Sequence, residues 1–187
     1  MLLVGQAAER LKFYSPEEYL AWEAEQPTRH ELVEGLPYAM AGASRVHNLL
    51  VGNLYAALRP WARPQGCRIY TERVKLRVGE RTFYYPDLMV VCEGEPPHSH
   101  YEENPCLVVE VLSEATEPVD RREKLWRYRE LPSLQGYLLV DSRARRVEVY
   151  ARQGEGWLYT LAEAGVVEVP CLGVRVSLEE VYEGVGV

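Results

Sequence analysis

Residues 106–112, Cys106-Leu107-Val108-Val109-Glu110-Val111-Leu112, form an almost continuous apolar run that contains a single acid. A run of this kind predicts a strand that is buried on both faces, as in the interior of a parallel or mixed sheet. An ionised carboxylate at Glu110 would cost several kcal/mol unless a cation pairs with it. A metal ion or a buried arginine would meet this need, and so would a strand end that lets Glu110 reach solvent.

A second acid interrupts the preceding apolar run, residues 83–91, where Asp87 follows Pro86. Proline cannot donate to a strand ladder, so it indicates a sheet edge or a bulge, and bulges are frequent beside active sites. Two neighbouring strands that each carry an inward carboxylate would repel each other unless a divalent cation lay between them. We therefore expect Asp87 and Glu110 to hold magnesium or manganese, which prefer oxygen ligands.

The sequence before this pair predicts two helices, a hairpin and two strands. A short helix begins at the Ser15 cap and ends near residue 25, and residues 31–40 form a hairpin that turns near Gly35. A longer helix begins after Ser44 and ends before Pro64, with His47, Leu50, Val51, Leu54, Leu58 and Trp61 on one face. Single strands are expected over residues 67–78 and 82–92, followed by a loop over 94–104.

After the central strand, the pattern predicts a helix over residues 116–130 and then mainly strands. The expected strands cover 136–140, 146–151 and 157–161, with short strands near Val167 and Val174 and a last helical turn from Ser177. This order predicts one α/β domain spanning residues 1–187, built as a mixed β-sheet flanked by α-helices with additional β-hairpins.

The bulk composition indicates an ordinary globular protein, with 47% hydrophobic and 26% charged residues among 187. No apolar run approaches the roughly 20 residues of a membrane helix. The apolar start at Met1 to Val4 ends at Gly5 and has no basic residues, so we expect no signal peptide and a cytoplasmic location. The net charge of -7 disfavours binding of nucleic acid by overall attraction, although a metal and a few arginines can form a local positive groove.

The four cysteines, Cys67, Cys92, Cys106 and Cys171, are scattered and contain no C-x-x-C pair. Zinc-finger and dithiol redox motifs need such close spacing. Because three of the four lie in apolar, strand-like runs, we predict buried free thiols that behave as small hydrophobic side chains.

The pair Pro86-Asp87 followed by Glu110-Val111-Leu112 resembles the signature of PD-(D/E)XK nucleases. More narrowly, the chain is similar to the bacterial restriction-endonuclease family known as domain of unknown function 820. This resemblance implies a restriction-endonuclease-like fold and a magnesium-dependent endonuclease that cleaves DNA. It extends from the first helix through Val140 and is carried by Tyr19, Glu31-Leu32-Val33-Glu34-Gly35, His47, Pro86-Asp87, Glu110-Val111-Leu112-Ser113, Asp120, Lys124, Tyr128 and the strand from Gly136 to Asp141.

The chain departs from the signature at Leu112, where a lysine is usual. The resemblance implies that Lys124, on the following helix, supplies the catalytic amine instead. Asp120, Lys124 and Tyr128 are spaced i, i+4, i+8, so they share one helix face. The alternative is that Lys124 forms only a surface ion pair with Asp120, which would contribute little to stability.

Further residues are candidates for metal or phosphate contacts. The resemblance implies that Glu34 binds the metal and that His47 joins the metal or orients a phosphate, although His47 could equally be a buried core histidine. Arg73, Lys75 and Arg77 alternate along one strand and could contact nucleic-acid phosphates, or they could pair with the many glutamates.

Two other functions compete with a DNA endonuclease. A catalytically degenerate module would bind nucleic acid or protein without cleavage, as the displaced lysine and the acidic net charge suggest. A metal-dependent phosphohydrolase would act on small nucleotides instead. For an endonuclease that cuts both strands of a duplex, we expect a symmetric homodimer.

Overall fold

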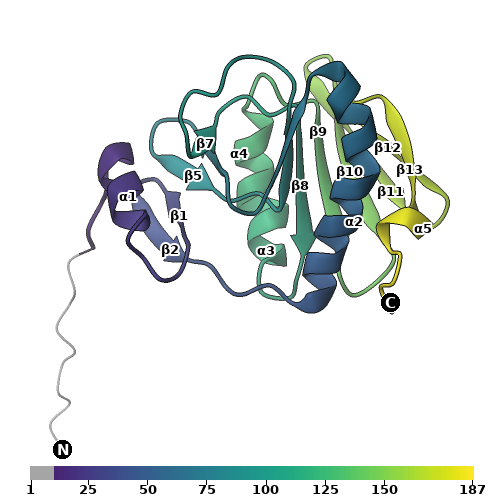
Figure 1. The fold of residues 1–187 in the computed structure, drawn as a ribbon, viewed down its shortest axis with the longest axis horizontal. Helices are drawn as coiled ribbons and strands as arrows, with labels where there is room; N and C mark the ends of the chain where they lie inside the picture. Colours follow the sequence, from purple (N-terminus) through teal and green to yellow (C-terminus); the bar gives the residue numbers. More distant parts are fainter. Residues whose placement is uncertain (1–10) are drawn as a thin grey trace, which may run out of the picture.

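The computed structural model describes residues 11–187, so the expectation for Met1 to Gly5 lies outside the described part of the chain (Figure 1). Its strands form sheets of five, six and two strands, with helices packed against them. The α/β class predicted from the sequence is confirmed. Among residues 11–187, no helix combines the length and the apolar character needed to cross a membrane.

The largest sheet has six strands in the order β11-β10-β9-β8-β6-β3. β8 and β9 run parallel, and the other neighbours run antiparallel, so the sheet is mixed as predicted. β8 is fully buried, as its apolar sequence indicated. The strands are β3 (Arg68–Thr71), β6 (Leu88–Val91), β8 (Leu107–Leu112), β9 (Gly136–Asp141), β10 (Val147–Gln153) and β11 (Gly156–Ala162).

Helices cover both faces of this sheet, and the alternation of β8 shows which face each one covers. Leu107, Val109 and Val111 pack in one core with α2 (Arg45–Ala62), whereas Val108 and Leu112 pack in a second core with Tyr128 of α4. Because side chains alternate along a strand, Glu110 faces the α4 side. The segment on that side consists of α3 (Glu117–Val119), a π-helical turn (Asp120–Lys124) and α4 (Leu125–Arg129).

α2 begins at the predicted cap, where the Ser44 side chain accepts a hydrogen bond from the His47 amide. Leu50, Leu54 and Leu58 form its buried face as expected. The prediction for Trp61 was wrong, because its side chain is 54% exposed while the small Ala62 is buried in its place. A short 3-10 turn (Arg63–Gln65) then leads from α2 to β3.

The second sheet has the order β2-β1-β5-β4-β7 and lies beside the first (Figure 1). The predicted hairpin over 31–40 is confirmed as β1 and β2. α1 (Pro16–Glu23) packs here through Tyr19, which is buried with Leu32 and Phe83. The strands are β1 (His30–Val33), β2 (Leu36–Ala39), β4 (Lys75–Val78), β5 (Thr82–Tyr84) and β7 (Tyr101–Glu102).

At two of the places where the chain passes between these two sheets, a single continuous strand was predicted. The predicted strand 67–78 divides into β3 and β4, and the predicted strand 82–92 divides into β5 and β6. Pro86 lacks a backbone donor and so interrupts the predicted strand 82–92. In the predicted strand 67–78, Glu72 has a left-handed φ of 33°. The Glu72 amide donates to the Asp87 carbonyl at 3.3 Å. Both acids therefore lie where the sheets separate.

The C-terminal region confirms the strands and the last helical turn predicted there. β10 pairs with β11, β12 (Val166–Val169) pairs with β13 (Val174–Ser177), and α5 (Leu178–Val181) begins at a capping box on Ser177. The prediction of free cysteine thiols was wrong, because the structure joins Cys67 to Cys92 and Cys106 to Cys171. The sequence could not indicate this pairing, since the partners are 25 and 65 residues apart.

Candidate active site

A pocket of about 620 Å³ lies where the two sheets separate, beside the first turn of α2 and the α3 region. Its lining is strongly acidic, with seven carboxylates against two strongly basic side chains, Arg29 and Lys124. Such an excess of negative charge favours the binding of a cation. The seven acids are Glu31, Glu72, Asp87, Glu110, Glu114, Asp120 and Glu123.

Asp87 and Glu110 lie together in this pocket, as the sequence predicted. β6 pairs Leu88 with Val109, and continuing this register by one residue sets Asp87 opposite Glu110. The Asp87 amide donates to Glu110 Oε2 at 3.4 Å, and the Val111 amide donates to Asp87 Oδ2 at 2.7 Å. Each carboxylate is thus fixed by the backbone of the other's strand.

Lys124 is buried in the same cluster and is not a surface residue, since only 6% of it is exposed. Its Nζ atom lies 3.1 Å from Glu31 Oε1, 3.3 Å from Glu110 Oε1 and 3.3 Å from Asp120 Oδ1. The pair with Asp120 has the predicted i, i+4 spacing, but both partners are buried. The amine therefore reaches the β8 acid from the helix that covers this face of the sheet.

Asp120 and Lys124 both belong to the π-helical turn, and Tyr128 follows in α4. Turns of this kind are rare and frequent at functional sites. The Tyr128 hydroxyl donates to Glu110 Oε1 at 2.9 Å, and the Tyr137 hydroxyl donates to the Asp120 carbonyl at 3.0 Å. The helix thereby holds both the amine and the Glu110 carboxylate in place.

Burial dominates the electrostatics of this cluster. It raises the pKa of Glu110 well above the usual value; Lys124 opposes this effect, while Asp120, Asp87 and Glu31 add to it. Burial also disfavours the charged form of Lys124, but Glu110, Glu31 and Asp120 outweigh it and hold the pKa of this amine well above normal. Lys124 is therefore an ammonium ion, a hydrogen-bond donor with no free lone pair.

His47 lies on the other side of Asp87 and connects it to Glu72. His47 Nε2 is 3.0 Å from Asp87 Oδ1, and Nδ1 is 3.6 Å from Glu72 Oε1. Burial lowers the pKa of His47, but hydrogen bonding to Asp87 and the nearby carboxylates raise it by more. Within residues 11–187, the buried Nδ1 atom has no hydrogen-bond partner. These three side chains offer ligand atoms within 4.8 Å of one another, a spacing that suits a metal ion.

Glu34, which the resemblance implied as a metal ligand, is not brought to this cluster. It lies in the β1–β2 turn at a φ of 50°, with its side chain 61% exposed and paired with Arg127. Glu31, three residues earlier in β1, faces the pocket instead and accepts a hydrogen bond from the Tyr85 amide at 3.1 Å. Because side chains alternate along β1, Glu31 and the buried Leu32 point to opposite faces.

The structure also places the three candidate phosphate contacts away from the pocket lining. Lys75 is buried beside the rings of Tyr19 and Tyr85, where burial lowers its pKa. Arg77 pairs with Glu103 at 3.4 Å, and Arg73 is exposed just before β4. Lys75 and Arg77 both lie over aromatic rings of the second sheet and its helix, so this face of β4 is not open to a phosphate.

The sequence did not indicate Glu72, and the resemblance implied Glu34 and not Glu31 as a metal ligand. Glu72 carries no local signal, since its place depends on the crossing between β3 and β4. Glu31 alternates with Leu32 in the hairpin, and this period-2 pattern could have indicated its direction. The assembled side chains offer carboxylate oxygens, one imidazole and one ammonium ion, a set suited to a divalent cation and an anionic substrate.

Comparison with known proteins gives the same assignment as the sequence pattern. The model of the Uma2 family, described as "Putative restriction endonuclease", matches residues 16–183. Two uncharacterised proteins of Synechocystis sp. are similar: slr1290 is 34% identical over 91% of this chain and 92% of its own length, and sll1609 is 35% identical over 80% and 87%. A crystal structure described as a "putative nuclease belonging to DUF820", from Anabaena variabilis, shares the fold with a TM-score of 0.75 at 17% identity, covering 90% of this chain and 97% of its own.

Proposed function

Because the chain belongs to the Uma2 family of restriction-endonuclease-like proteins, we propose that it is a magnesium- or manganese-dependent endonuclease that hydrolyses phosphodiester bonds in DNA. One observation carries the proposal: the buried Glu110 carboxylate lies between Asp87 and the Lys124 ammonium, in a pocket dominated by acids. A purely structural role would not explain why so many carboxylates meet around a single lysine.

The residues of the pocket fit a hard divalent cation. Asp87 and Glu110 would hold it, and on the other side of Asp87 the His47 imidazole and the Glu72 carboxylate would supply further donors, since their ligand atoms lie within 4.8 Å of one another and of Asp87. When bound, such a cation lowers the pKa of a coordinated water and stabilises charge on the phosphate. It would also compensate the negative charge that raises the pKa of Glu110.

Lys124 would act on the substrate as a fixed cationic donor. Its raised pKa keeps the proton on the amine, so it would donate to a phosphate oxygen or orient the attacking water and would not remove a proton. Its three carboxylate neighbours hold the ammonium group in one place. Preorganised charge of this kind stabilises a transition state more than a mobile surface lysine would.

DNA as the substrate and a homodimer as the active form are part of the same proposal. The family description supports DNA, since restriction endonucleases cut that polymer. A twofold dimer would present one pocket to each strand of a duplex. With a net charge of -7, binding would depend on the cation and on local arginines more than on overall attraction.

The test is cleavage of duplex DNA, single-stranded DNA and RNA by the wild type and by Asp87→Asn and Glu110→Gln, with Mg²⁺, Mn²⁺ or EDTA present. We expect metal-dependent cleavage of DNA by the wild type alone, together with loss of the calorimetric heat of Mn²⁺ binding in both variants. Cleavage that survives in either variant would refute the assignment. DNA binding without metal binding or cleavage would instead identify a degenerate module.

A further inference from the structure

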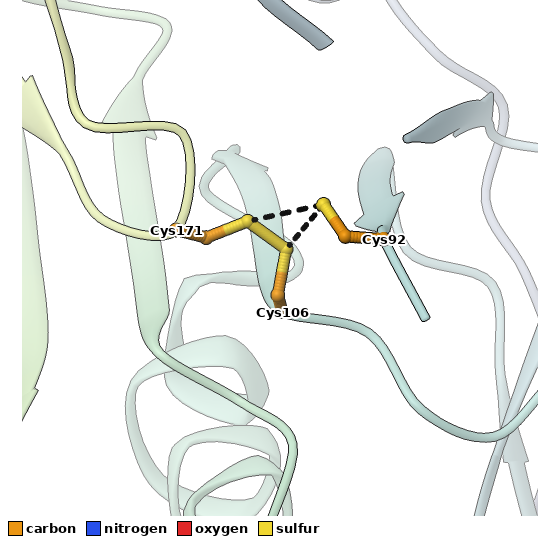
Figure 2. Close-up of side chains that lie close together, drawn as sticks. All are labelled: Cys92, Cys106 and Cys171. Carbon is orange, nitrogen blue, oxygen red and sulfur yellow. Dashed lines mark hydrogen bonds between the residues drawn. A yellow bond between two sulfur atoms is a disulfide. The ribbon is translucent and has the colours of Figure 1, made fainter. Parts of the chain in front are cut away.

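The sulfurs of three cysteines, Cys92, Cys106 and Cys171, lie within 4.8 Å of one another, although these residues come from separate segments of the chain. Cys92 Sγ lies 3.4 Å from Cys106 Sγ and 3.7 Å from Cys171 Sγ, and Cys67 is bonded to Cys92. Figure 2 shows the sulfur of Cys92 pointing toward the bonded pair of Cys106 and Cys171. Two structural disulfides do not require contact with each other, so the meeting of these three sulfurs, with Cys67 bonded to one of them, calls for a separate explanation.

The fold positions these side chains at one end of the central strands. β3 pairs Arg68 with Val91, so continuing the register sets Cys67 opposite Cys92, and the Cα atoms of these cysteines are 4.0 Å apart. The Cys106 amide donates to the Val90 carbonyl at 2.8 Å, which brings the start of β8 alongside. Three sulfurs therefore come from adjacent strand ends of one sheet.

The fourth sulfur comes from the turn between β12 and β13, which packs closely on the sheet. Cys171 has a left-handed φ of 74° in this turn. The close approach depends on Gly136, because a Cβ atom there would lie 2.8 Å from the Pro170 ring. The turn is thus seated tightly enough for Cys171 to reach Cys106.

We propose that, in the reduced chain, Cys67, Cys92, Cys106 and Cys171 form a tetrahedral thiolate site for a zinc ion. With Zn–S bonds of about 2.3 Å, a tetrahedral site places its sulfurs about 3.8 Å apart. The separations of Cys92 Sγ from Cys106 Sγ and Cys171 Sγ, 3.4 and 3.7 Å, are close to this value, and Cys67 is bonded to Cys92. A multi-iron cluster would hold its thiolates farther apart, because several metal atoms would lie between them.

The oxidised and metal-bound forms are related by balanced steps. A dithiol reductant gives four electrons and four protons to the two disulfides, which yields four thiols and the oxidised reductant. Zinc binding then forms four Zn–S bonds and releases four protons to solvent, with no change in the oxidation state of the metal. Zinc therefore binds only the reduced form.

This site is separate from the carboxylate pocket, and it does not rest on the proposed function. β6 carries Asp87 just before its first residue and Cys92 just after its last, so the two sites lie at opposite ends of one strand. None of the four cysteines lines the pocket. Bound zinc would link β3, β6, β8 and the β12–β13 turn, and it would stabilise the folded chain by binding that state alone.

Metal analysis of the full chain, purified under a dithiol reductant with zinc supplied, tests the proposal. We expect one zinc per chain in the wild type and in Asp87→Asn, and none in Cys92→Ser or Cys171→Ser. Cobalt in place of zinc should give the intense visible bands of a tetrahedral thiolate complex. Zinc that is lost in Asp87→Asn but kept in Cys171→Ser would assign the metal to the carboxylates and overturn the proposal.

A second measurement avoids the risk that the serine variants do not fold. The reduced wild type is titrated with zinc against a chromophoric chelator while the thiols are counted with a thiol reagent. We expect four reactive thiols without zinc and protection of all four at one equivalent. A reduced, folded chain that takes up no zinc, or whose thiols remain equally reactive, refutes the site. An equivalent of iron in place of zinc would also refute the stated metal.

Discussion

The Nζ atom of Lys124 lies 3.3 Å from Glu110 Oε1, although one residue belongs to a helix-side turn and the other to the strand beneath it. In the PD-(D/E)XK signature the amine follows the acid on the same strand, at a position that is Leu112 here. The structure therefore brings acid and amine together from two elements. Leu112 packs in the core between the sheet and α4, so the amine comes from the helix and not from β8.

Lys124→Met is expected to destabilise the metal-free protein strongly. It would leave Glu110 and Asp120 buried without their cation, and breaking a buried pair in this way costs about 3–5 kcal/mol. Urea denaturation with and without Mn²⁺ measures the effect, and cation binding should recover part of the loss. Lys75→Met is the matched control, because the buried environment of Lys75 already disfavours its charge. Equal destabilisation by both changes would contradict this account of Lys124.

Tyr128→Phe should weaken metal binding while preserving the packing of the ring. The hydroxyl donates to Glu110 Oε1, while the ring contacts those of Tyr84 and Tyr137 at centroid distances of 5.5 and 5.2 Å. Loss of a hydrogen bond that orients a ligand reduces metal affinity about 10- to 100-fold. Calorimetric titration with Mn²⁺ measures this loss. An unchanged Mn²⁺ affinity, together with lower thermal stability, would mean that the hydroxyl serves the fold only.

The variants Glu31→Gln and Glu34→Gln distinguish the roles of two acids that lie in the same β-hairpin. Glu31 contacts Lys124 at 3.1 Å, whereas Glu34 is exposed and paired with Arg127. We expect Glu31→Gln to lower cleavage by about 10- to 100-fold, as loss of an outer-shell partner does. Glu34→Gln should leave activity unchanged and stability within about 0.5 kcal/mol of wild type. If Glu34→Gln lowered cleavage more than Glu31→Gln did, Glu34 would be the metal ligand, as the family resemblance implied.

Tyr182→Phe gives a stability change that depends on pH. The buried hydroxyl donates to the carbonyls of Asp141 and Arg146 at 2.8 Å, and burial raises the pKa of Tyr182 to about 12 from 10.0. Removing the donor should cost about 1–3 kcal/mol below pH 10. The unfolded chain loses this proton near pH 10 and the folded chain near pH 12, so the hydroxyl's contribution to stability is lost as pH rises through this window. Denaturation of both proteins from pH 8 to 12 should show that the difference between their free energies of unfolding becomes smaller as the pH rises. A constant difference would contradict the raised pKa.

Local patterns in the sequence predicted most of the helices and strands. The apolar run of β8, the Ser44 cap of α2 and the capping box at Ser177 each act through near neighbours, so each was predicted in its observed place. The exceptions were the strands predicted over 67–78 and 82–92. Neither segment contains a glycine at its crossing between the sheets, and only Pro86 indicated a break.

The part of the candidate site that could be predicted is where a charged residue interrupts an apolar run in the sequence. Glu110 within an apolar strand is such a case, and it led to Asp87 and then to Lys124. Glu72 and the meeting of Cys92, Cys106 and Cys171 have no comparable local signature, because they depend on segments brought together only by folding. Ligands spread over four segments cannot show the close spacing by which zinc motifs are identified.

Because the amine comes from the helix, the residue at position 112 of the central strand is under a different constraint. Since Leu112 fills space and performs no chemistry, selection at this position acts on volume and shape, and exchange for another apolar residue of similar size should be tolerated. In a relative that keeps lysine at the equivalent place, the same exchange would remove the reactive amine. A motif search that requires acid and lysine on one strand would overlook chains of this kind, whereas a spatial template of two acids and an amine would retrieve them.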